Sequence, residues 1–346
     1  MRNFGRRELL LAGLAMGLAG CSRQPEAVQA PTPSGTAGSS APPTASPSPS
    51  PRSTPAWTAR VMTYNLLTPN LGGSHFRDAV DDDDLKLANR APVMAKWITA
   101  AAPDIIGLQE NEANPPRRLP VRALAPLLPG YRVLLPELNV PLLIRTDRYA
   151  AEKYGAVDIS QGHYSRHVGW YRLRHLATGR RLLVTNTHLD PFQKRYMARA
   201  RAAEMAEIVD LIGELDPRGK LPTLLLGDLN VRADETRPVW GDPLTLLAAA
   251  GLHDAARLAE RDISEVPGAA TLNSFGTRVG GRWTYRAIRS DGYRYDYIFV
   301  SRGTRVKTWQ VVTGPGVRTR DGQPFFADGP VPSDHCPVQA EVEFPA

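Results

Sequence analysis

Polar side chains stand at the ends of several strand-like segments in this sequence. The segment "PTLLLGDLN" runs through three leucines and ends around Asp228 and Asn230. Five further segments have a similar form: "TYNLL", "DIIGLQE", "TNTHLD", "YRYDYIFV" and "PSDHCPV". If these strands lie side by side, their ends gather the polar groups at one rim. The residues placed there are Asn65, Glu110, His188, Asp228, Asn230, Asp296, Asp334 and His335.

The residue types in this set suit phosphoester hydrolysis assisted by a hard divalent cation. Magnesium prefers oxygen ligands in near-octahedral geometry and keeps several waters, so one or two carboxylates and an amide oxygen are enough to hold it. A neutral histidine near a carboxylate can take a proton from water or give one to a leaving oxygen. Asparagine and protonated histidine donate hydrogen bonds to oxygens that gain negative charge during in-line displacement.

Taken singly, these residues also have structural alternatives. Asn65 could end a strand in a turn, His188 could be a hydrogen-bonded core histidine, and Asp334 could cap a helix. Glu110 is harder to explain in this way, because a carboxylate that closes a buried strand is costly unless it is paired. The spacing of Asp228 and Asn230 predicts that both point to one face of a strand and share a target.

The segments that must hold these groups are mostly strands. Runs such as "ARVMTYNLL", "RRLLVTNTHL" and "YDYIFVS" combine β-branched, aromatic or leucine residues with turn signals at their ends. Apolar residues recur at helical spacing from Asn89 to Ala101 and from Arg195 to Leu215. Residues 177–179 predict a hairpin turn. The pattern predicts an α/β fold, a four-layer α/β sandwich in which two packed mixed β-sheets are flanked by helices.

Six segments, in this order along the chain, resemble the endonuclease/exonuclease/phosphatase superfamily: "TYNLL", "DIIGLQE", "TNTHLD", "GDLN", "YDYIFVS" and "SDHCPV". Its members include pancreatic deoxyribonuclease, abasic-site endonucleases, bacterial sphingomyelinases and inositol phosphatases. The resemblance covers nearly all of residues 57–346. It implies a deoxyribonuclease-I-like fold and a metal-dependent phosphoesterase, with Mg²⁺ as cofactor and Mn²⁺ or Ca²⁺ as alternatives.

The resemblance also implies which residues bind the metal. Asn65 and Glu110 match the family's metal-binding positions, with Glu110 as the principal carboxylate. Asp334 would complete the pocket, and a second metal at this residue is an alternative.

Catalytic roles follow from the resemblance in the same way. Asp228 and Asn230 would position or deprotonate the attacking water and hold the phosphate. His188 would contact the phosphate or the leaving oxygen, and Asp296 would orient His335. Whether Asp228 or His335 is the base stays open, because coupled groups need geometry before roles are assigned.

The substrate is a phosphoester whose class stays open: nucleic acid, phospholipid or a small phosphate ester. Abasic-site nucleases carry an acidic residue shortly after the first asparagine, whereas "NLLTPN" has leucines and then Thr68, which argues against DNA repair. Alternatives are an extracellular endonuclease acting on DNA or RNA and an inactive binding module on the same fold, although the complete residue set disfavours the latter. No G-x-S-x-G elbow or P-loop is present, which excludes a serine hydrolase and a P-loop enzyme of the usual kinds.

The N-terminal segment predicts export. Residues 1–20 begin with basic side chains, continue with an apolar run too short to span a bilayer, and end in small residues before Cys21. The ending "LAGC" resembles a bacterial lipobox, which implies lipidation of Cys21, and the pair Arg6-Arg7 also suits a twin-arginine route.

A linker separates this anchor from the folded part. Residues 21–56 are rich in Pro, Ser and Thr and contain too few large apolar residues to fold, so they predict a disordered, lipid-anchored tether. Residues 57–346 then form one catalytic domain, because neither a repeat nor a second linker interrupts them. We expect a monomer that is exported and either held by lipid at the extracytoplasmic side of the cell membrane or secreted.

Composition adds few constraints. The chain carries +7, and residues 1–56 hold five Arg and two Glu, which leaves +4 for the remainder. This mild charge neither requires nor excludes a polyanionic substrate. With Cys21 lipidated, Cys336 has no disulfide partner and is expected to be buried.

One further motif stays open on sequence grounds, and another predicts a surface segment. In "QGHYSRHVGW", the residues His163, Arg166 and His167 either line the pocket or lie on the surface. The run Asp81–Asp84 lacks the alternating ligands of an EF-hand loop and predicts a solvated loop or a helix start.

Overall fold

The structure is a computed structural model of the chain. All the residues that it describes belong to the second of two compact units, Ser53–Ala346. The predicted signal segment, the linker up to residue 55, Cys21 and Asp81–Asp84 lie outside the described residues. Among the described helices, none combines the length and the apolar character needed to cross a membrane. The described residues are 56–68, 86–112, 119–137, 139–191, 195–233, 242–272, 277–279, 282–284, 294–315, 317–320, 323–326 and 332–345.

Two large mixed β-sheets form the centre of the molecule. The first contains seven strands, in the spatial order β10 (Arg261–Asp262), β14 (Arg305–Val311), β17 (Val338–Phe344), β1 (Trp57–Asn65), β2 (Ile105–Gln109), β4 (Leu142–Arg145) and β3 (Tyr131–Leu134). The second contains six, in the order β5 (Tyr149–Asp158), β6 (His167–His175), β7 (Arg181–His188), β8 (Thr223–Asp228), β13 (Asp296–Ser301) and β9 (Leu252–Asp254).

A third, smaller sheet was not predicted. Its four strands, in spatial order, are β11 (Thr277–Val279), β12 (Arg282–Thr284), β16 (Gln323–Phe326) and β15 (Val317–Arg320).

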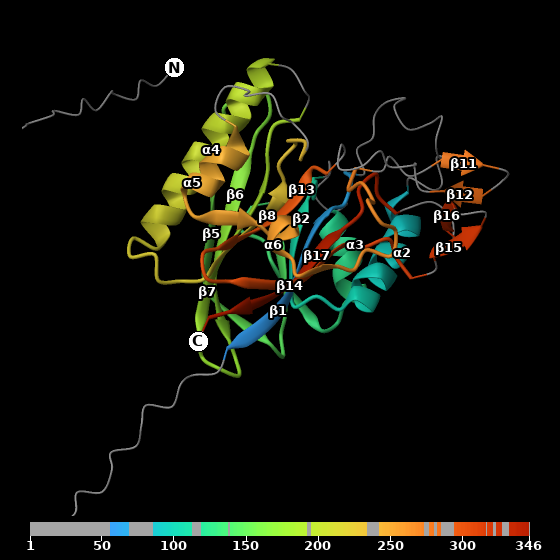
Figure 1. The fold of residues 1–346 in the computed structure, drawn as a ribbon, viewed down its shortest axis with the longest axis horizontal. Coiled ribbons are helices and arrows are strands. Elements are labelled where there is room, and N and C mark those ends of the chain that lie inside the picture. The colour runs from blue at the N-terminus through green and yellow to red at the C-terminus, as the bar shows by residue number, and fades with distance from the viewer. Residues whose placement is uncertain are drawn as a thin grey trace, which may run out of the picture. The chain divides into compact units, whose positions relative to one another are not determined.

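Helices cover the outer faces of the two large sheets. Figure 1 shows α2 and α3 on one side of the sheets and α4 and α5 on the other. The helix α2 ends where Ala102 adopts a φ of 44° and donates its N–H to Ile98 O at 2.8 Å, just before Pro103. The helices are α2 (Leu87–Ala101), α3 (Pro120–Leu124), the 3₁₀ helix η2 (Ala125–Leu127), α4 (Arg195–Leu215), α5 (Pro243–Ala249) and α6 (Ala255–Leu258).

Side chains of the central strands alternate between two buried faces. On β1, Val61 joins the core between the sheets, whereas Met62 packs with the apolar face of α2. On β8, Leu226 joins the core between the sheets, whereas Leu225 packs with the apolar face of α4. Burial of one such side chain contributes about 1.5–3 kcal/mol. The continuous apolar runs follow from this arrangement, because both faces of these strands are covered.

The predicted architecture is confirmed. The four layers are α2 and α3, the seven-stranded sheet, the six-stranded sheet, and α4 with α5. The predicted helix from Arg195 to Leu215 has those bounds in the structure. The predicted hairpin at residues 177–179 joins β6 and β7, with Gly179 at a φ of 71°. Cys336 is buried, as expected, and forms no disulfide with any described residue.

Candidate active site

Strand pairing brings the predicted site residues to one pole of the sandwich. β1 and β2 are parallel, so Asn65 at the end of β1 lies beside the last residue of β2, which precedes Glu110. In the facing sheet, His188 and Asp228 are register partners at the ends of the parallel strands β7 and β8. Asp296, at the start of the antiparallel strand β13, pairs with Asp228. The order of the strands therefore places these side chains together.

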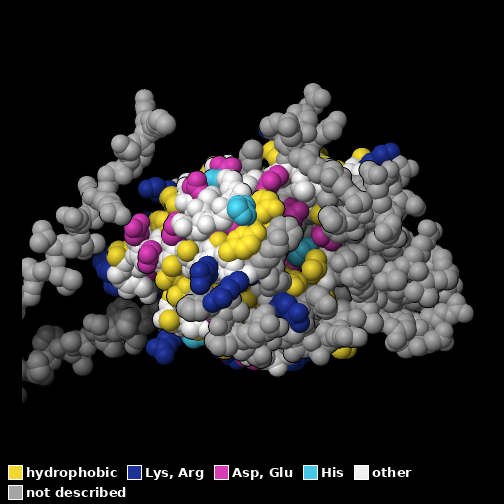
Figure 2. Space-filling view, turned by 90° about the horizontal axis from the view of Figure 1, so that it is seen from above, with side chains coloured by type: hydrophobic (Ala, Val, Ile, Leu, Met, Phe, Trp, Pro, Cys, Tyr) yellow, Lys and Arg dark blue, Asp and Glu magenta, His cyan; other side chains and the backbone are white. Residues whose placement is uncertain are grey.

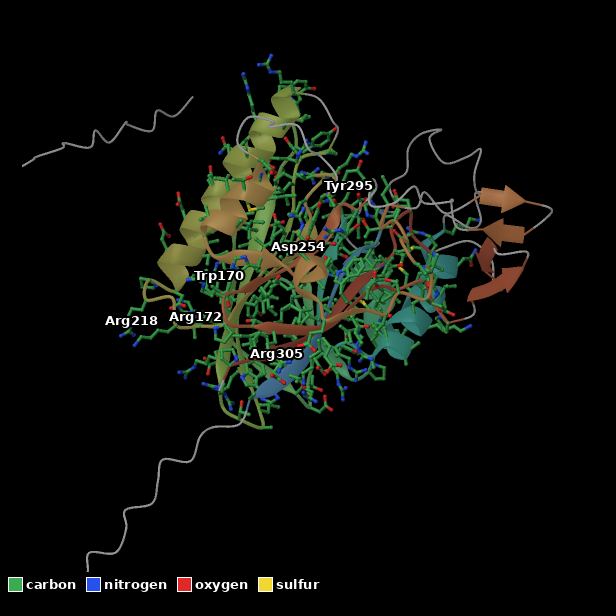
Figure 3. All side chains as sticks on the ribbon, in the orientation of Figure 1. Trp170, Arg172, Arg218, Asp254, Tyr295 and Arg305 are labelled. Atoms are coloured by element: carbon green, nitrogen blue, oxygen red, sulfur yellow. The ribbon has the colours of Figure 1, made fainter. Side chains whose placement is uncertain are left out.

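The figures locate this pole. Tyr295, labelled in Figure 3, immediately precedes Asp296 and marks the pole, whereas the labelled Arg305 lies at the opposite side of the drawing. Figure 2 views the molecule from above and shows histidine and acidic side chains close together on this face.

Left-handed backbone conformations recur at the site. Among the described residues, four non-glycine residues have a positive φ, and three of them are Leu67, Glu110 and Asn230, at 56°, 55° and 52°. Such conformations cost roughly 1 kcal/mol or more and persist where the surrounding structure imposes them. β8 ends at Asp228, and Asn230 follows it in a left-handed conformation, so this turn places Asn230 beside Asp228. The expectation that both residues lie on one face of the strand was wrong.

Asn65 lies at the centre of a hydrogen-bond network that links the two sheets. Its Nδ2 donates to Glu110 Oε1 at 3.1 Å and to Asp228 Oδ2 at 3.0 Å, while its Oδ1 accepts from the N–H of Leu67 at 3.0 Å. The other oxygen of Glu110 accepts from the N–H of Thr68 at 3.0 Å. Asn65 therefore presents amide hydrogens to both carboxylates and holds them together. Its assignment as a metal ligand stays a prediction.

His335 is oriented by a short hydrogen bond to Asp296. Its Nδ1 lies 2.8 Å from Asp296 Oδ2, and both side chains are buried. Its Nε2 lies 3.7 Å from Asp228 Oδ2. The structure thus brings Asp296, His335 and Asp228 into one line of polar contacts, in which the second ring nitrogen of His335 faces Asp228.

His188 and Asn230 lie on the other side of Asp228. His188 Nε2 is 3.6 Å from Asp228 Oδ2 and 3.0 Å from Asn230 Nδ2. The N–H of Asn230 donates to Asp228 Oδ1 at 2.9 Å, and its side-chain amide also donates to Leu189 O at 3.0 Å. Asp228 is therefore surrounded by groups from both sheets.

Asp334 lies in a segment that is fastened to the end of β1. Ser333 Oγ donates to Asn65 O at 2.8 Å and accepts from the N–H of His335 at 3.2 Å. The buried guanidinium of Arg90 donates to backbone carbonyls that follow β1 and precede Asp334, at 2.7 and 3.0 Å. The structure therefore fixes Asp334 and His335 against Asn65.

Burial and mutual charge shift the pKa values of the site. Burial raises the pKa of Asp228 to about 7, helped by Asp296 and opposed by His335. Burial also raises the pKa of Asp334 to about 6, against the attraction of His335. For His335, burial lowers the pKa, but Asp296, Asp228 and Asp334 outweigh it, and the pKa lies well above its usual range. Burial, with Arg166 and His335, lowers the pKa of His188 well below its usual range.

The donor set suits a divalent cation. Asp228, Asp296 and His335 each offer a ligand atom, and these atoms lie within 4.8 Å of one another. Asp296 Oδ1 is buried and has no hydrogen-bond partner among the described residues. Asp334 is close enough to Glu110 for their charges to interact. Because buried carboxylates are costly unless positive charge compensates them, this group could hold a metal ion.

Arg166 and Asp190 are additional buried polar residues at the site. Arg166 is 6% exposed; its Nη1 lies 3.4 Å from His188 Nδ1, and its Nε lies 3.3 Å from Asp190 Oδ1. The N–H of Asp190 donates to Glu204 Oε2 on α4 at 3.1 Å. The sequence left open whether Arg166 lines the pocket or lies on the surface, and it did not single out Asp190 or Glu204. A carboxylate on the apolar face of a predicted helix was the available signal for Glu204.

Solved structures share this fold. An endonuclease/exonuclease/phosphatase family protein from Bacteroides thetaiotaomicron is 23% identical with a TM-score of 0.65, and the match covers 84% of this chain and 99% of that chain. The mannosyl-6-phosphatase of the same bacterium is 22% identical with a TM-score of 0.63, covering 82% and 99%. The catalytic domain of human nocturnin, with bound sulfate, is 19% identical with a TM-score of 0.55, covering 82% and 94%. These similarities define a deoxyribonuclease-I-like α/β sandwich.

Residues 62–335 match the model of the Endonuclease/Exonuclease/phosphatase family, and this range is most of the chain. The chain therefore belongs to that family. No curated protein matches the sequence. Members of the family are phosphoesterase and nuclease hydrolases that use divalent metals, so this protein is a hydrolase acting on ester bonds.

Proposed function

We propose that this protein is a divalent-metal-dependent phosphoesterase that hydrolyses a phosphomonoester or phosphodiester by in-line attack of water, outside the cytoplasm. The convergence of two groups of residues supports the proposal most strongly. Asn65 and Glu110 come from one sheet, and Asp228 with the Asp296–His335 pair comes mainly from the other. A fold alone would not require buried acids, an amide and an imidazole to meet at one point.

Each residue has a task that its contacts support. Asp296 holds the ring of His335, so that His335 Nε2 and Asp228 Oδ2 face each other at 3.7 Å. These two groups form the pair that accepts the proton of the attacking water. His188 and Asn230 lie beside Asp228, and their side chains would turn to the phosphate oxygens when substrate binds and stabilise the negative charge that develops there.

The cation would be held by carboxylates of this site. Glu110 and Asp334, with the amide oxygen of Asn65 as the third predicted ligand, supply the hard oxygen donors that Mg²⁺ or Mn²⁺ accepts, which leaves Asp228 and His335 available as the base pair. A bound divalent ion polarises the phosphoryl oxygen and stabilises negative charge. The name of the Bacteroides mannosyl-6-phosphatase supports the inclusion of phosphomonoesters among the substrates.

A substrate panel tests the proposal. The full chain is assayed with magnesium on double-stranded DNA, single-stranded RNA, sphingomyelin, inositol phosphates and nucleotides, before and after chelation with EDTA. We expect hydrolysis of at least one ester, its loss in EDTA, and its recovery with excess magnesium. Activity that persists in EDTA would contradict the metal role.

A pair of matched variants tests the site itself. Glu110→Gln keeps the shape of the side chain but removes its charge, and we expect kcat to fall about 100-fold or more. Glu214→Gln makes the same chemical change at an exposed residue in the last turn of α4, and this control should keep the wild-type rate. Full activity of Glu110→Gln would refute the assignment.

The extracytoplasmic location is a second part of the proposal. Its support is the basic and apolar segment that ends in "LAGC", followed by the Pro/Ser/Thr-rich residues 21–56. A lipid on Cys21 would tether the catalytic domain to the outer side of the cell membrane, where the domain would act as a monomer. Cell fractionation tests this part.

A further inference from the structure

The loop between β5 and β6 is held firmly beside the site. The N–H of Ile159 donates to Arg166 O at 2.9 Å, and the N–H of Arg166 donates to Ser160 Oγ at 2.8 Å. The side chain of Gln161 bonds to Glu207 on α4. A Cβ at Gly162 would lie 1.5 Å from Asp190 Oδ2, so only glycine allows the loop to approach this closely. The loop is therefore positioned by contacts on both of its flanks.

This loop presents ring faces to solvent. Tyr164 is 42% exposed, and Tyr196, in the first turn of α4, is 47% exposed. The ring of His163 meets the ring of Tyr196 edge to face, with centroids 5.5 Å apart. We call Tyr164, His163 and Tyr196 the aromatic rim. The two exposed tyrosine rings leave apolar surface uncovered, which suggests that a ligand covers it.

A chain of contacts joins the aromatic rim to the site. The guanidinium of Arg166 lies over the ring of Tyr164, 5.2 Å from its centroid. Arg166 Nη1 in turn lies 3.4 Å from His188 Nδ1. The ring of Tyr164 is thus two contacts away from His188, which borders Asp228.

The chemistry of the loop favours a flat aromatic ligand over a sugar. Two polar side chains of the loop are already engaged within the protein, because Ser160 bonds to Asp158 and to the N–H of Arg166, and Gln161 bonds to Glu207. The rim instead offers ring faces backed by a guanidinium, which is how nucleobases are stacked in sequence-tolerant sites. Arg195 and Arg199, exposed in the first turns of α4, add positive charge that suits phosphate groups.

We propose that the aromatic rim, with Tyr164 as its main platform, stacks a nucleobase of the substrate, so that the protein cleaves nucleotide phosphoesters. This inference rests on the proposed function, because it assigns the group that is attached to the phosphate. A mononucleotide and a single-stranded oligonucleotide share this chemistry.

The test compares two esters of the same bond type, one with and one without a base. Adenosine 5′-monophosphate is paired with glycerol 3-phosphate, and a dinucleotide is paired with glycerophosphoethanolamine. For Tyr164→Ala we expect the ratio of kcat/KM for the base-bearing ester to that for the base-free ester to fall about 5- to 100-fold, mainly through KM. Tyr164→Phe keeps the ring and should keep the ratio.

Tyr154→Ala is the matched control. Tyr154 is also 42% exposed but lies on the edge strand β5, and its ring stacks on Tyr171. This control should keep the wild-type ratio. An unchanged ratio in Tyr164→Ala, or a preference of the wild-type protein for a hexose 6-phosphate over both nucleotide forms, would overturn the assignment. Preference for either the mononucleotide or the oligonucleotide supports it.

Failure of the proposed function has a different result. If the wild-type protein hydrolyses none of these esters with magnesium or manganese, the proposed function is wrong. The base site is then tested by calorimetric titration of the full chain with adenosine 5′-monophosphate and with glycerol 3-phosphate. Tighter binding of the nucleotide that is lost in Tyr164→Ala supports the base site, and equal binding of the two ligands overturns it.

Discussion

The contact between Asp296 and His335 gives a sharp test of the site. Asp296→Asn preserves the shape of the side chain and an acceptor oxygen, but it removes the charge that lies 2.8 Å from His335 Nδ1. Both side chains are buried, so solvent screens this charge poorly. Asp296 is the strongest of the neighbours that raise the pKa of His335, and we expect that pKa to fall in the variant.

The size of the effect follows from the role of the pair. A positioned acid or base contributes about 10²- to 10⁴-fold to the rate, so we expect kcat to fall by that factor at saturating magnesium. This corresponds to roughly 3–5 kcal/mol in the activation free energy. The assay is initial-rate kinetics as a function of pH, with circular dichroism to establish that the variant is folded. The pH–rate limb that depends on His335 should move to lower pH.

Asp254→Asn is the control for Asp296→Asn. Asp254 pairs with β13 from the neighbouring strand β9, and it bonds to Arg294 at 3.1 and 2.6 Å, so it is a half-buried aspartate that is also paired. We expect this control to lose stability but to keep the kcat of its folded fraction. If Asp296→Asn is folded and retains more than about a tenth of the wild-type kcat, the role assigned to the Asp296–His335 pair is wrong.

Two further predictions concern other parts of the chain. Burial raises the pKa of Glu204 from 4.5 to about 7, so the folded protein binds this proton more tightly than the unfolded chain does. The resulting contribution to stability is complete below pH 4.5 and is lost as the pH rises through 7. In urea unfolding, the free energy of unfolding of Glu204→Gln relative to that of the wild type should therefore rise by about 3 kcal/mol between pH 4.5 and pH 8. Glu214→Gln should show no such rise. A difference between Glu204→Gln and the wild type that does not change with pH would refute this reasoning. Cys21→Ala should move the protein from the membrane fraction to the soluble fraction of the producing cells, and unchanged membrane retention would contradict lipid anchoring at Cys21.

Local patterns in the sequence determined much of the fold. Apolar residues at helical spacing from Arg195 to Leu215 predicted α4, because one face of a surface helix must be apolar. Continuous apolar runs such as Leu224–Leu226 predicted strands covered on both faces, and the two sheets with outer helices provide that cover. Polar residues at the ends of such runs also predicted which side chains meet, because strand ends collect at the poles of a sandwich.

Only the tertiary structure decided how these side chains face one another. Nothing local shows that Asn65 turns its amide hydrogens toward Glu110 and Asp228, because this orientation depends on the pairing of strands far apart in the sequence. The burial of Arg166 against His188 likewise depends on strand register, because Val168 near the start of β6 pairs with Thr187 near the end of β7. The sequence thus specifies which residue types stand at the strand ends. The distances between their side chains depend on strand register, sheet packing and the left-handed turns that follow the strands.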